Sequence, residues 1–221
     1  MNPVLEARSL YRFFHAGDDE TLALQGVSFD VTPGELIAIT GPSGSGKSTL
    51  LSCLAGLDEP DGGTVTLDGE RVSRRPEEER ARMRARKVGM LFQQVNLVGH
   101  LSVDANVALA QRLGRTGERA ARRADVLERA GIVHRAHARP GQLSGGELAR
   151  AGLAVALAND PPVILADEPT GELDEATALR VLDLLRERAS GGTAVLIVTH
   201  SQEVAAAADR ELRLRDGRIE P

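Results

Sequence analysis

The sequence predicts an α/β fold in which short buried strands alternate with helices around a parallel sheet. Short apolar runs end at glycine-rich or polar turns, as buried strands do. Helical patterns separate most of these runs, and strands that alternate with helices form parallel sheets. The stretch from 102 to 158 is mostly helical, which indicates a helical insertion in the α/β core.

The elements can be placed in chain order. Apolar alternation or buried apolar runs predict strands at 27–31, 36–40, 64–67, 88–92, 163–166 and 194–198. Periodicity predicts a helix that stops at Gly56, followed by helices at 76–87, 102–113, 118–130, 147–158, 175–189 and 202–208. Hairpin turns are expected at 68–69 and 216–217. The helix at 76–87 has acids first and bases last, which suits the helix dipole; the acids favour a solvated face over a nucleic-acid or lipid patch.

Composition limits the classes of function. The 221 residues are 42% hydrophobic and 27% charged, with a net charge of -5, which suits one domain with a sizeable core. An acidic balance with one Tyr, four Phe and no Trp argues against a nucleic-acid surface. The single cysteine, Cys53, excludes an internal disulfide and fits a reducing compartment. No apolar run approaches the roughly 20 residues of a membrane-spanning helix, so the chain is expected to be soluble and any membrane role to be peripheral.

Residues 41–48, GPSGSGKS, match the phosphate-loop pattern G-x-x-x-x-G-K-[ST]. Glycines let backbone N–H groups converge on phosphate oxygens, and the next helix points its positive end at the same place. Lys47 is expected to reach the β- and γ-phosphates, and the Ser48 hydroxyl to bind Mg²⁺. The alternative, an accidental glycine-rich turn, is disfavoured by the strand before and the helix after. The predicted nucleotide contacts are Gly41, Pro42, Ser43, Gly44, Ser45, Gly46, Lys47, Ser48 and Thr49.

Polar residues follow two later apolar runs. Asp167 and Glu168 come at the end of one predicted strand, where the first acid would support Mg²⁺ and the second would orient and deprotonate the attacking water. The alternative is a capping pair before Pro169. His200 follows the strand at 194–198, at the edge where ligands of open α/β sheets bind, and could hydrogen-bond a γ-phosphate. Helix capping is an equally good interpretation of His200.

Four further segments follow the phosphate loop in order: LFQQVNL (91–97), LSGGE (143–147), ILADEPTGELD (164–174) and VTH (198–200). With these segments the chain resembles the nucleotide-binding subunits of ABC transporters over essentially its whole length. It is most similar to the lipoprotein-release, macrolide-export and cell-division subgroup. The resemblance implies a P-loop NTPase (RecA-like) core with a parallel sheet, an N-terminal antiparallel β part and an inserted α-helical subdomain. A single domain, 1–221, would then comprise a catalytic core at 1–93 and 160–221 and a helical subdomain at about 94–159.

The resemblance also implies roles for single residues. Glu168 would be the general base and His200 the γ-phosphate sensor. Gln93 would contact Mg²⁺ or water in the loop that couples the core to the helical subdomain, and Asp174 would end the loop that crosses a dimer interface. Two chains would close around two ATP molecules. The γ-phosphate held by the opposite protomer would be bound by Ser144, Gly145 and Gly146.

Two of these assignments have a physical basis of their own. Ser144 precedes a predicted helix, so its segment offers free backbone donors at a positive helix end. A capping box between Ser144 and Glu147 is the simpler interpretation, and both can hold. Phe14 stands where the family has the aromatic residue that stacks on adenine, and Tyr11 or Phe13 could share that role; strand-edge packing is the alternative. Glu147 stands where the family more commonly has glutamine.

The function expected from this resemblance is ATP binding and hydrolysis that energises a separate membrane permease. The expected ligands are ATP and Mg²⁺, and the expected partners are a second ATPase protomer and an integral-membrane permease. The protein would be cytoplasmic and peripheral on the inner face of the cell membrane. A soluble ABC-type ATPase acting on nucleic acid or ribosomes is the main alternative, and a nonhydrolysing regulator is disfavoured by the intact catalytic residues. The sequence does not indicate the transported substrate.

Overall fold

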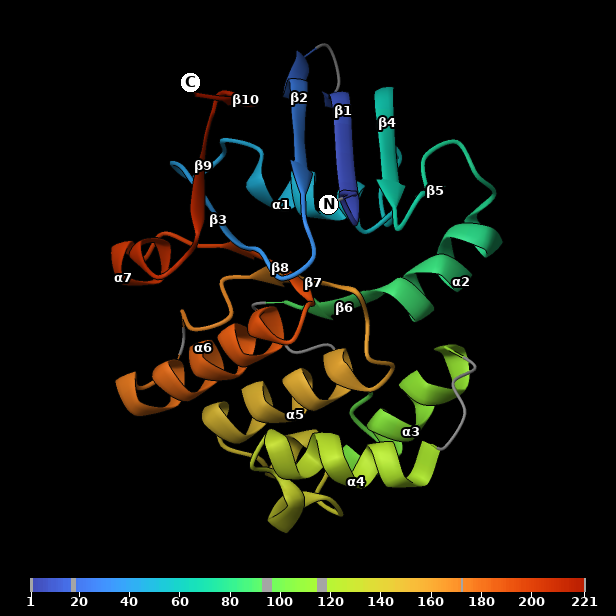
Figure 1. Ribbon diagram of the computed structural model, residues 1–221, viewed down its shortest axis with the longest axis vertical. Coiled ribbons are helices and arrows are strands. Elements are labelled where there is room, and N and C mark those ends of the chain that lie inside the picture. Colours follow the sequence, from blue (N-terminus) through green and yellow to red (C-terminus); the bar gives the residue numbers. More distant parts are fainter. Residues whose placement is uncertain (1, 17–18, 93–96, 115–118, 172, 221) are drawn as a thin grey trace.

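The computed structural model describes residues 2–16, 19–92, 97–114, 119–171 and 173–220, and places their strands in two sheets (Figure 1). The smaller sheet is antiparallel, with the strand order β2-β1-β4-β5. Its strands are β1 (Leu5–Ala16), β2 (Asp19–Val31), β4 (Gly62–Leu67) and β5 (Glu70–Arg71).

The larger sheet has the order β10-β9-β3-β8-β7-β6. Its first five strands in the chain pair in parallel, and β10 closes an antiparallel hairpin with β9. The strands are β3 (Leu36–Thr40), β6 (Val88–Leu91), β7 (Val163–Asp167), β8 (Ala194–Val198), β9 (Arg210–Arg215) and β10 (Arg218–Ile219). Because β3, β7 and β8 are neighbours, the turns that follow them meet at one edge of the sheet.

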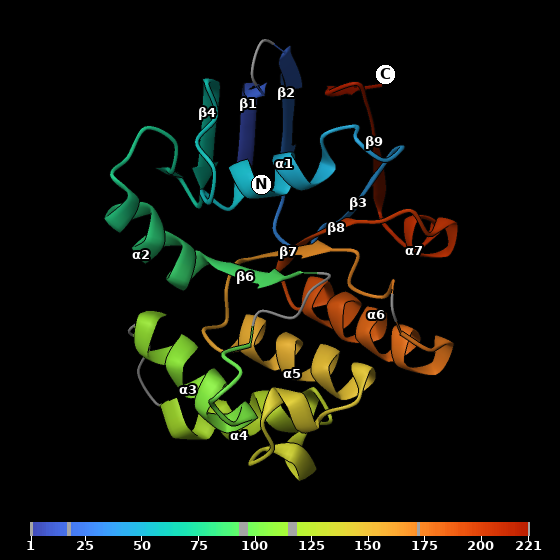
Figure 2. The same ribbon diagram turned by 180° about the vertical axis from the view of Figure 1, so that it is seen from behind.

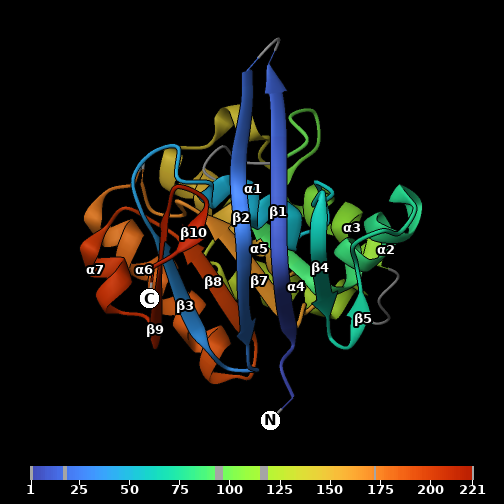
Figure 3. The same ribbon diagram turned by 90° about the horizontal axis from the view of Figure 1, so that it is seen from above.

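Helices lie between the two sheets and on the far side of the larger one. The view from above places α1 (Lys47–Leu54) under the antiparallel sheet (Figure 3). On the opposite side, α5 (Gly145–Leu157) and α6 (Glu175–Ser190) lie under the larger sheet, with α3 (Val103–Gly114) and α4 (Arg119–Arg129) beyond them (Figure 2). The remaining helices are α2 (Glu77–Lys87), α7 (Gln202–Ala206) and the short 3-10 turns η1 (Val133–Arg135) and η2 (Pro140–Gln142).

The larger sheet separates two hydrophobic cores, because its side chains alternate between its faces. Val163 and Leu165 of β7 join the core that contains α1 and the antiparallel sheet, whereas Ile164 and Ala166 join the core formed with α3 to α6. Cys53 is buried in the first core, and burial raises the pKa of its thiol to about 12, so we assign it no chemistry. Each fully buried Leu or Ile contributes roughly 1.5–3 kcal/mol relative to exposure.

The structure confirms the predicted fold class and shows where the sequence patterns fell short. The first strand had no clear alternation because its pairing shifts register between Ala7 and Leu10, with Ser9 at a φ of 49°. The strand predicted at 27–31 begins at Asp19, and the helix predicted at 147–158 begins at Gly145, where Ser144 caps it. In the described part of the chain, no helix combines the length and apolar character needed to cross a bilayer.

Candidate active site

The phosphate loop joins β3 to α1, and its first and last glycines, Gly41 and Gly46, are packed closely against neighbouring strands. Gly41 has a φ of 146° and Gly46 a φ of 101°, both of which favour glycine. A Cβ atom at Gly41 would lie 2.0 Å from the Leu214 carbonyl oxygen, and one at Gly46 would lie 2.3 Å from the Ala23 carbonyl oxygen. The tertiary packing of β2 and β9 therefore requires glycine at both ends of the loop.

Three polar features of the loop suit a phosphate ligand: a lysine, a helix end and a buried hydroxyl. Lys47 folds back over the loop and donates from Nζ to the carbonyl oxygens of Gly41 and Pro42, each at 2.9 Å. The first turn of α1 has no acidic residue, so its positive end is not neutralised locally. Ser45 is buried, and its hydroxyl makes no hydrogen bond with the described residues. Such a group is satisfied when a ligand supplies the partner.

Asp167 ends β7 beside the start of α1. Burial raises the pKa of this carboxyl group, and a hydrogen bond from the Ser48 hydroxyl acts in the opposite direction. A hydroxyl and a carboxylate oxygen beside a phosphate loop are the ligand types that Mg²⁺ prefers when phosphates and waters complete its octahedron. No group of three or more His, Cys, Asp or Glu side chains that could hold a metal occurs in the described ranges.

Glu168 and His200 meet at the carboxyl ends of β7 and β8. The Nδ1 atom of His200 lies 2.8 Å from Oε1 of Glu168, and the amide of Glu168 donates to the Val198 carbonyl oxygen at 2.9 Å. Glu168 has a φ of 47°, a left-handed conformation that is uncommon outside glycine and frequent at functional sites. Its side chain is 15% exposed, whereas that of His200 is 75% exposed, so the carboxylate is held and the imidazole is accessible.

The Ser144 segment is a capped helix start. Ser144 accepts the amide of Glu147 at 3.3 Å, and the Glu147 carboxylate accepts the amide of Ser144 at 2.9 Å, so the predicted capping box is present. A Cβ atom at Gly146 would lie 3.1 Å from Oγ1 of Thr177. Thr177 in turn donates from Oγ1 to Asp174 at 2.7 Å, and Asp174 caps α6. The two segments expected at a dimer interface therefore touch through Thr177.

Phe14 lines a pocket of about 390 Å³ together with the phosphate loop. Gly44, Lys47 and Thr49 belong to the same wall, and the Phe14 side chain is accessible. Tyr11 does not line this pocket, because its ring packs against Gly26 and Gly62 instead. Phe13 is also absent from the pocket wall.

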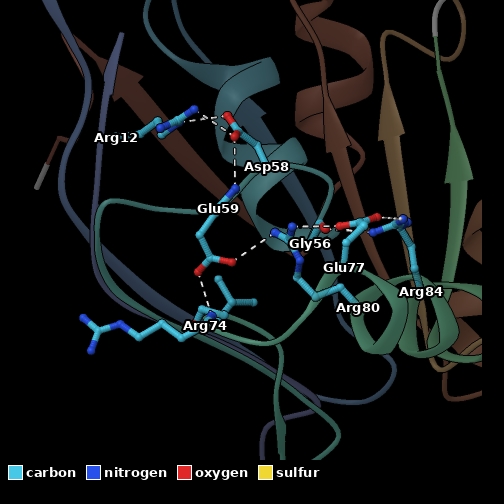
Figure 4. Close-up of polar contacts among 10 residues, drawn as sticks. Arg12, Gly56, Asp58, Glu59, Arg74, Glu77, Arg80 and Arg84 are labelled. Atoms are coloured by element: carbon cyan, nitrogen blue, oxygen red, sulfur yellow. Dashed lines mark hydrogen bonds and ion pairs between the residues drawn. The ribbon is translucent and has the colours of Figure 1, made fainter.

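The Arg12 side chain packs against the ring of Phe14. Its guanidinium lies 4.8 Å from the centroid of the Phe14 ring, within cation–π range. It also donates two hydrogen bonds of 2.9 Å to Asp58 and one of 3.1 Å to Asp61. Figure 4 shows the pair of Arg12 and Asp58 and its continuation through Glu59 to Arg80 on α2. One face of the ring is thereby occupied by a cation.

The structure brings most of the expected residues to one edge of the larger sheet: the phosphate loop, Asp167, Glu168, His200 and Phe14. Gln93 lies outside the described residues. Besides the Ser144 amide, the Glu147 carboxylate contacts His134 and Arg135 of η1. Sequence reasoning missed Arg12 and Thr177 as positioning residues, because an isolated Arg or Thr carries no signal until its partners are known.

Comparisons with known proteins agree with this geometry. The sequence profile of a family described as ABC transporter matches residues 24–171. The chain is 44% identical to an uncharacterized ABC transporter ATP-binding protein of Thermotoga maritima, covering 100% of this chain and 95% of that protein. It is 43% identical to the lipoprotein-releasing system ATP-binding protein LolD of Pseudomonas syringae pv. tomato, covering 98% and 96%.

Two further comparisons bear on architecture. The macrolide export ATP-binding/permease protein MacB of Hyphomonas neptunium is 42% identical over 98% of this chain, but the chain spans only 34% of that protein. Among solved structures, a dimeric post-hydrolysis state of the ATP-binding cassette MJ0796, bound to ADP and Pi, matches with a TM-score of 0.91 at 36% identity. That match covers 98% of this chain and 97% of the other.

Proposed function

The chain belongs to the ABC transporter family, and from this premise we propose that it binds and hydrolyses ATP to drive a membrane permease partner. One observation carries the proposal: a phosphate loop with a free helix end lies beside the Ser48–Asp167 pair and the Glu168–His200 pair. The relatives found are transporter components, so the alternative of a soluble ATPase acting on nucleic acid or ribosomes gains no support.

Phosphate binding falls to residues 41–49. Backbone N–H groups at the start of α1 bind the phosphate oxygens, and Lys47 exchanges its two carbonyl partners for the β- and γ-phosphates. The adenine stacks on the face of Phe14 that Arg12 leaves free. Ser48, Asp167 and Gln93 are the residues proposed to hold Mg²⁺. When bound, the ion neutralises charge on the phosphate oxygens.

Hydrolysis requires a base for the attacking water. Glu168 is proposed for this role, because its carboxylate is held at the strand end. It can accept the proton of the water that attacks the γ-phosphorus, while the bond from the γ-phosphorus to the bridging oxygen breaks and ADP leaves with that oxygen. His200 is proposed to sense the γ-phosphate, and its Nδ1 atom contacts the Glu168 carboxylate. General base catalysis of this type contributes roughly 10²–10⁴-fold to the rate.

The second half of each site is proposed to come from another copy of the chain. Ser144, Gly145 and Gly146 present the free donors of the α5 start to the γ-phosphate bound by the partner, and Asp174 lies at the interface. In this arrangement, residues 1–93 and 160–221 form the catalytic core and about 94–159 the helical subdomain. The dimeric form of the solved cassette MJ0796 supports the proposal.

The permease is proposed to dock around residues 93–100 and the helical subdomain, holding the ATPase at the inner face of the membrane. LolD is named for a lipoprotein-releasing system and MacB for macrolide export, so the cargo differs between relatives. Replacing Val98 by Cys and crosslinking in native membranes should capture an integral-membrane protein. Failure to capture one would argue against this docking site.

The sharpest test of the ATPase assignment is the variant Glu168→Gln. It should lower ATP turnover by at least about 100-fold while leaving ATP binding intact, because the amide cannot accept the proton. The stalled variant should form an ATP-dependent dimer, which sedimentation velocity can detect. Glu203→Gln, an acid on α7 beyond His200, is a matched control that should keep parental turnover. Parental turnover in Glu168→Gln would refute the base assignment.

A further inference from the structure

The anion-binding start of α5 contains a negative charge of its own. Glu147 is the third residue of the helix, and its carboxylate accepts the amide of Ser144 at 2.9 Å. That hydrogen bond, with the nearby guanidinium of Arg135, holds the pKa of Glu147 below its ordinary value, so the group is ionised. A carboxylate here repels an incoming phosphate and weakens the site that the helix end provides.

The structure places a cation on this carboxylate from a different element. Arg135, in η1, lies with Nε 3.1 Å from Oε1 of Glu147. Nε2 of His134 lies 3.5 Å from the same oxygen, but only Arg135 carries a permanent charge. The Glu147 side chain is 18% exposed, so the pair is less screened by solvent than an open surface pair.

Arg135 makes a second contact that bears on the same segment. Its Nη2 group donates to the backbone carbonyl of Gln142, two residues before Ser144. One guanidinium therefore joins the chain entering the Ser144 segment to the carboxylate that caps it. The extended planar guanidinium allows the ion pair with Glu147 and the hydrogen bond to Gln142 at once, which the single ammonium group of a lysine could not reproduce in the same geometry.

We propose that Arg135 is a positioning residue for the partner-facing phosphate site: its charge neutralises Glu147 beside Ser144, and its hydrogen bond to Gln142 holds the guanidinium in that position. The inference rests on the proposed function and deepens it, because it identifies the cation that offsets the repulsion between the Glu147 carboxylate and a bound phosphate. It also predicts that the need for Arg135 depends on the charge of residue 147. A neutral glutamine side chain at that position keeps an oxygen for the Ser144 amide and removes the repulsion.

The test is a double-mutant cycle in the Glu168→Gln background, with the ATP concentration for half-maximal dimer formation as the readout. Arg135→Gln should raise this concentration roughly tenfold when Glu147 is present. Arg135→Gln combined with Glu147→Gln should restore it to within about twofold of Glu147→Gln alone. Arg129→Gln is the matched control, because it removes a cation from another Arg–carboxylate pair, with Asp125 at 2.9 Å. It should leave the ATP concentration for half-maximal dimer formation unchanged.

Binding of a fluorescent ATP analogue to the dilute protomer reports on the phosphate loop alone and should be the same in all variants. If Arg135→Gln weakened dimer formation equally with and without the Glu147→Gln substitution, the proposal would be overturned, because Arg135 would then be only structural. No loss in Arg135→Gln would also overturn it. If the Glu168→Gln parent binds ATP but forms no dimer, the proposed two-chain site is wrong. That result differs from the two above, because it is seen before Arg135 is replaced.

Discussion

Two segments of this chain are proposed to offer backbone donors to phosphate, and they are built in different ways. The phosphate loop is enclosed by other strands, with the carbonyl oxygens of Ala23 and Leu214 against its glycines. The Ser144 segment is held by its own capping box, and a Cβ atom at Gly145 would meet nothing within 4 Å. Tertiary packing encloses Gly41 and Gly46 at the ends of the first segment, whereas the second is capped by local hydrogen bonds and leaves Gly145 open.

The difference matches the role that is proposed for each segment. A loop that binds ATP in the isolated chain must be formed before the ligand arrives, so enclosure by β2 and β9 is useful. A segment that meets a ligand held by another molecule must present its donors to solvent until that molecule arrives. The comparison therefore predicts that equivalent substitutions in the two segments have different consequences.

The largest contrast is expected between Gly46→Ala and Gly145→Ala. Gly46→Ala combines a φ of 101° with an overlap at the Ala23 carbonyl oxygen, so it should cost roughly 3 kcal/mol or more and abolish ATP binding. Gly145→Ala should leave stability unchanged or slightly higher, since alanine favours helix. Urea unfolding and ATP titration measure both effects. Similar losses of stability in both variants would contradict the comparison.

Substitutions of Phe14 test the proposed stacking on adenine in the pocket beside the phosphate loop. Phe14→Ala should weaken ATP binding by about 1–3 kcal/mol, the usual size of base–aromatic stacking, while binding of inorganic tripolyphosphate stays the same. Phe14→Tyr is the matched control and should retain the affinity. Arg12→Gln should weaken ATP binding less than Phe14→Ala does, because the ring stays but loses the guanidinium that packs against it. Equal losses for ATP and tripolyphosphate would exclude a role in stacking.

Ser144→Ala tests the locally built segment. The substitution removes the oxygen that accepts the Glu147 amide, and the loss of such a cap typically costs about 1 kcal/mol. ATP affinity of the dilute protomer should not change, whereas ATP-dependent dimer formation should weaken. Ser144→Thr keeps a capping oxygen and should retain most of the stability. A loss of ATP affinity in the protomer would show that the two segments are not independent.

The smallest effect concerns Asp167 and pH. Burial raises its pKa, so the folded protein holds this proton more tightly than the unfolded chain does. The free energy of unfolding of the ligand-free protein should therefore fall as pH rises from the ordinary carboxyl range through the raised pKa, and stay lower above it. Asp167→Asn should lack this dependence. Urea unfolding from about pH 4 to pH 7 without Mg²⁺ measures it, and identical profiles would refute the assignment.

Much of the fold and of the candidate site could be predicted from short stretches of residues that are neighbours in the sequence. The phosphate loop, the acidic pair and the Ser144 cap each lie within a few residues of chain, and their chemistry depends on local backbone geometry. The missed strand β1 shows the limit of this reasoning, since a bulge near Ser9 erases the alternation that marks a strand.

The amino-acid sequence indicates which chemical groups follow a strand or begin a helix, because such signals depend on short-range backbone preferences. Which distant groups meet depends on the packing of the whole fold. His200 contacts Glu168 only because β7 and β8 are neighbours, and Arg12 braces Phe14 only because Asp58 ends up beside β1. These pairings depend on the packing of elements far apart in the chain, which no local pattern encodes.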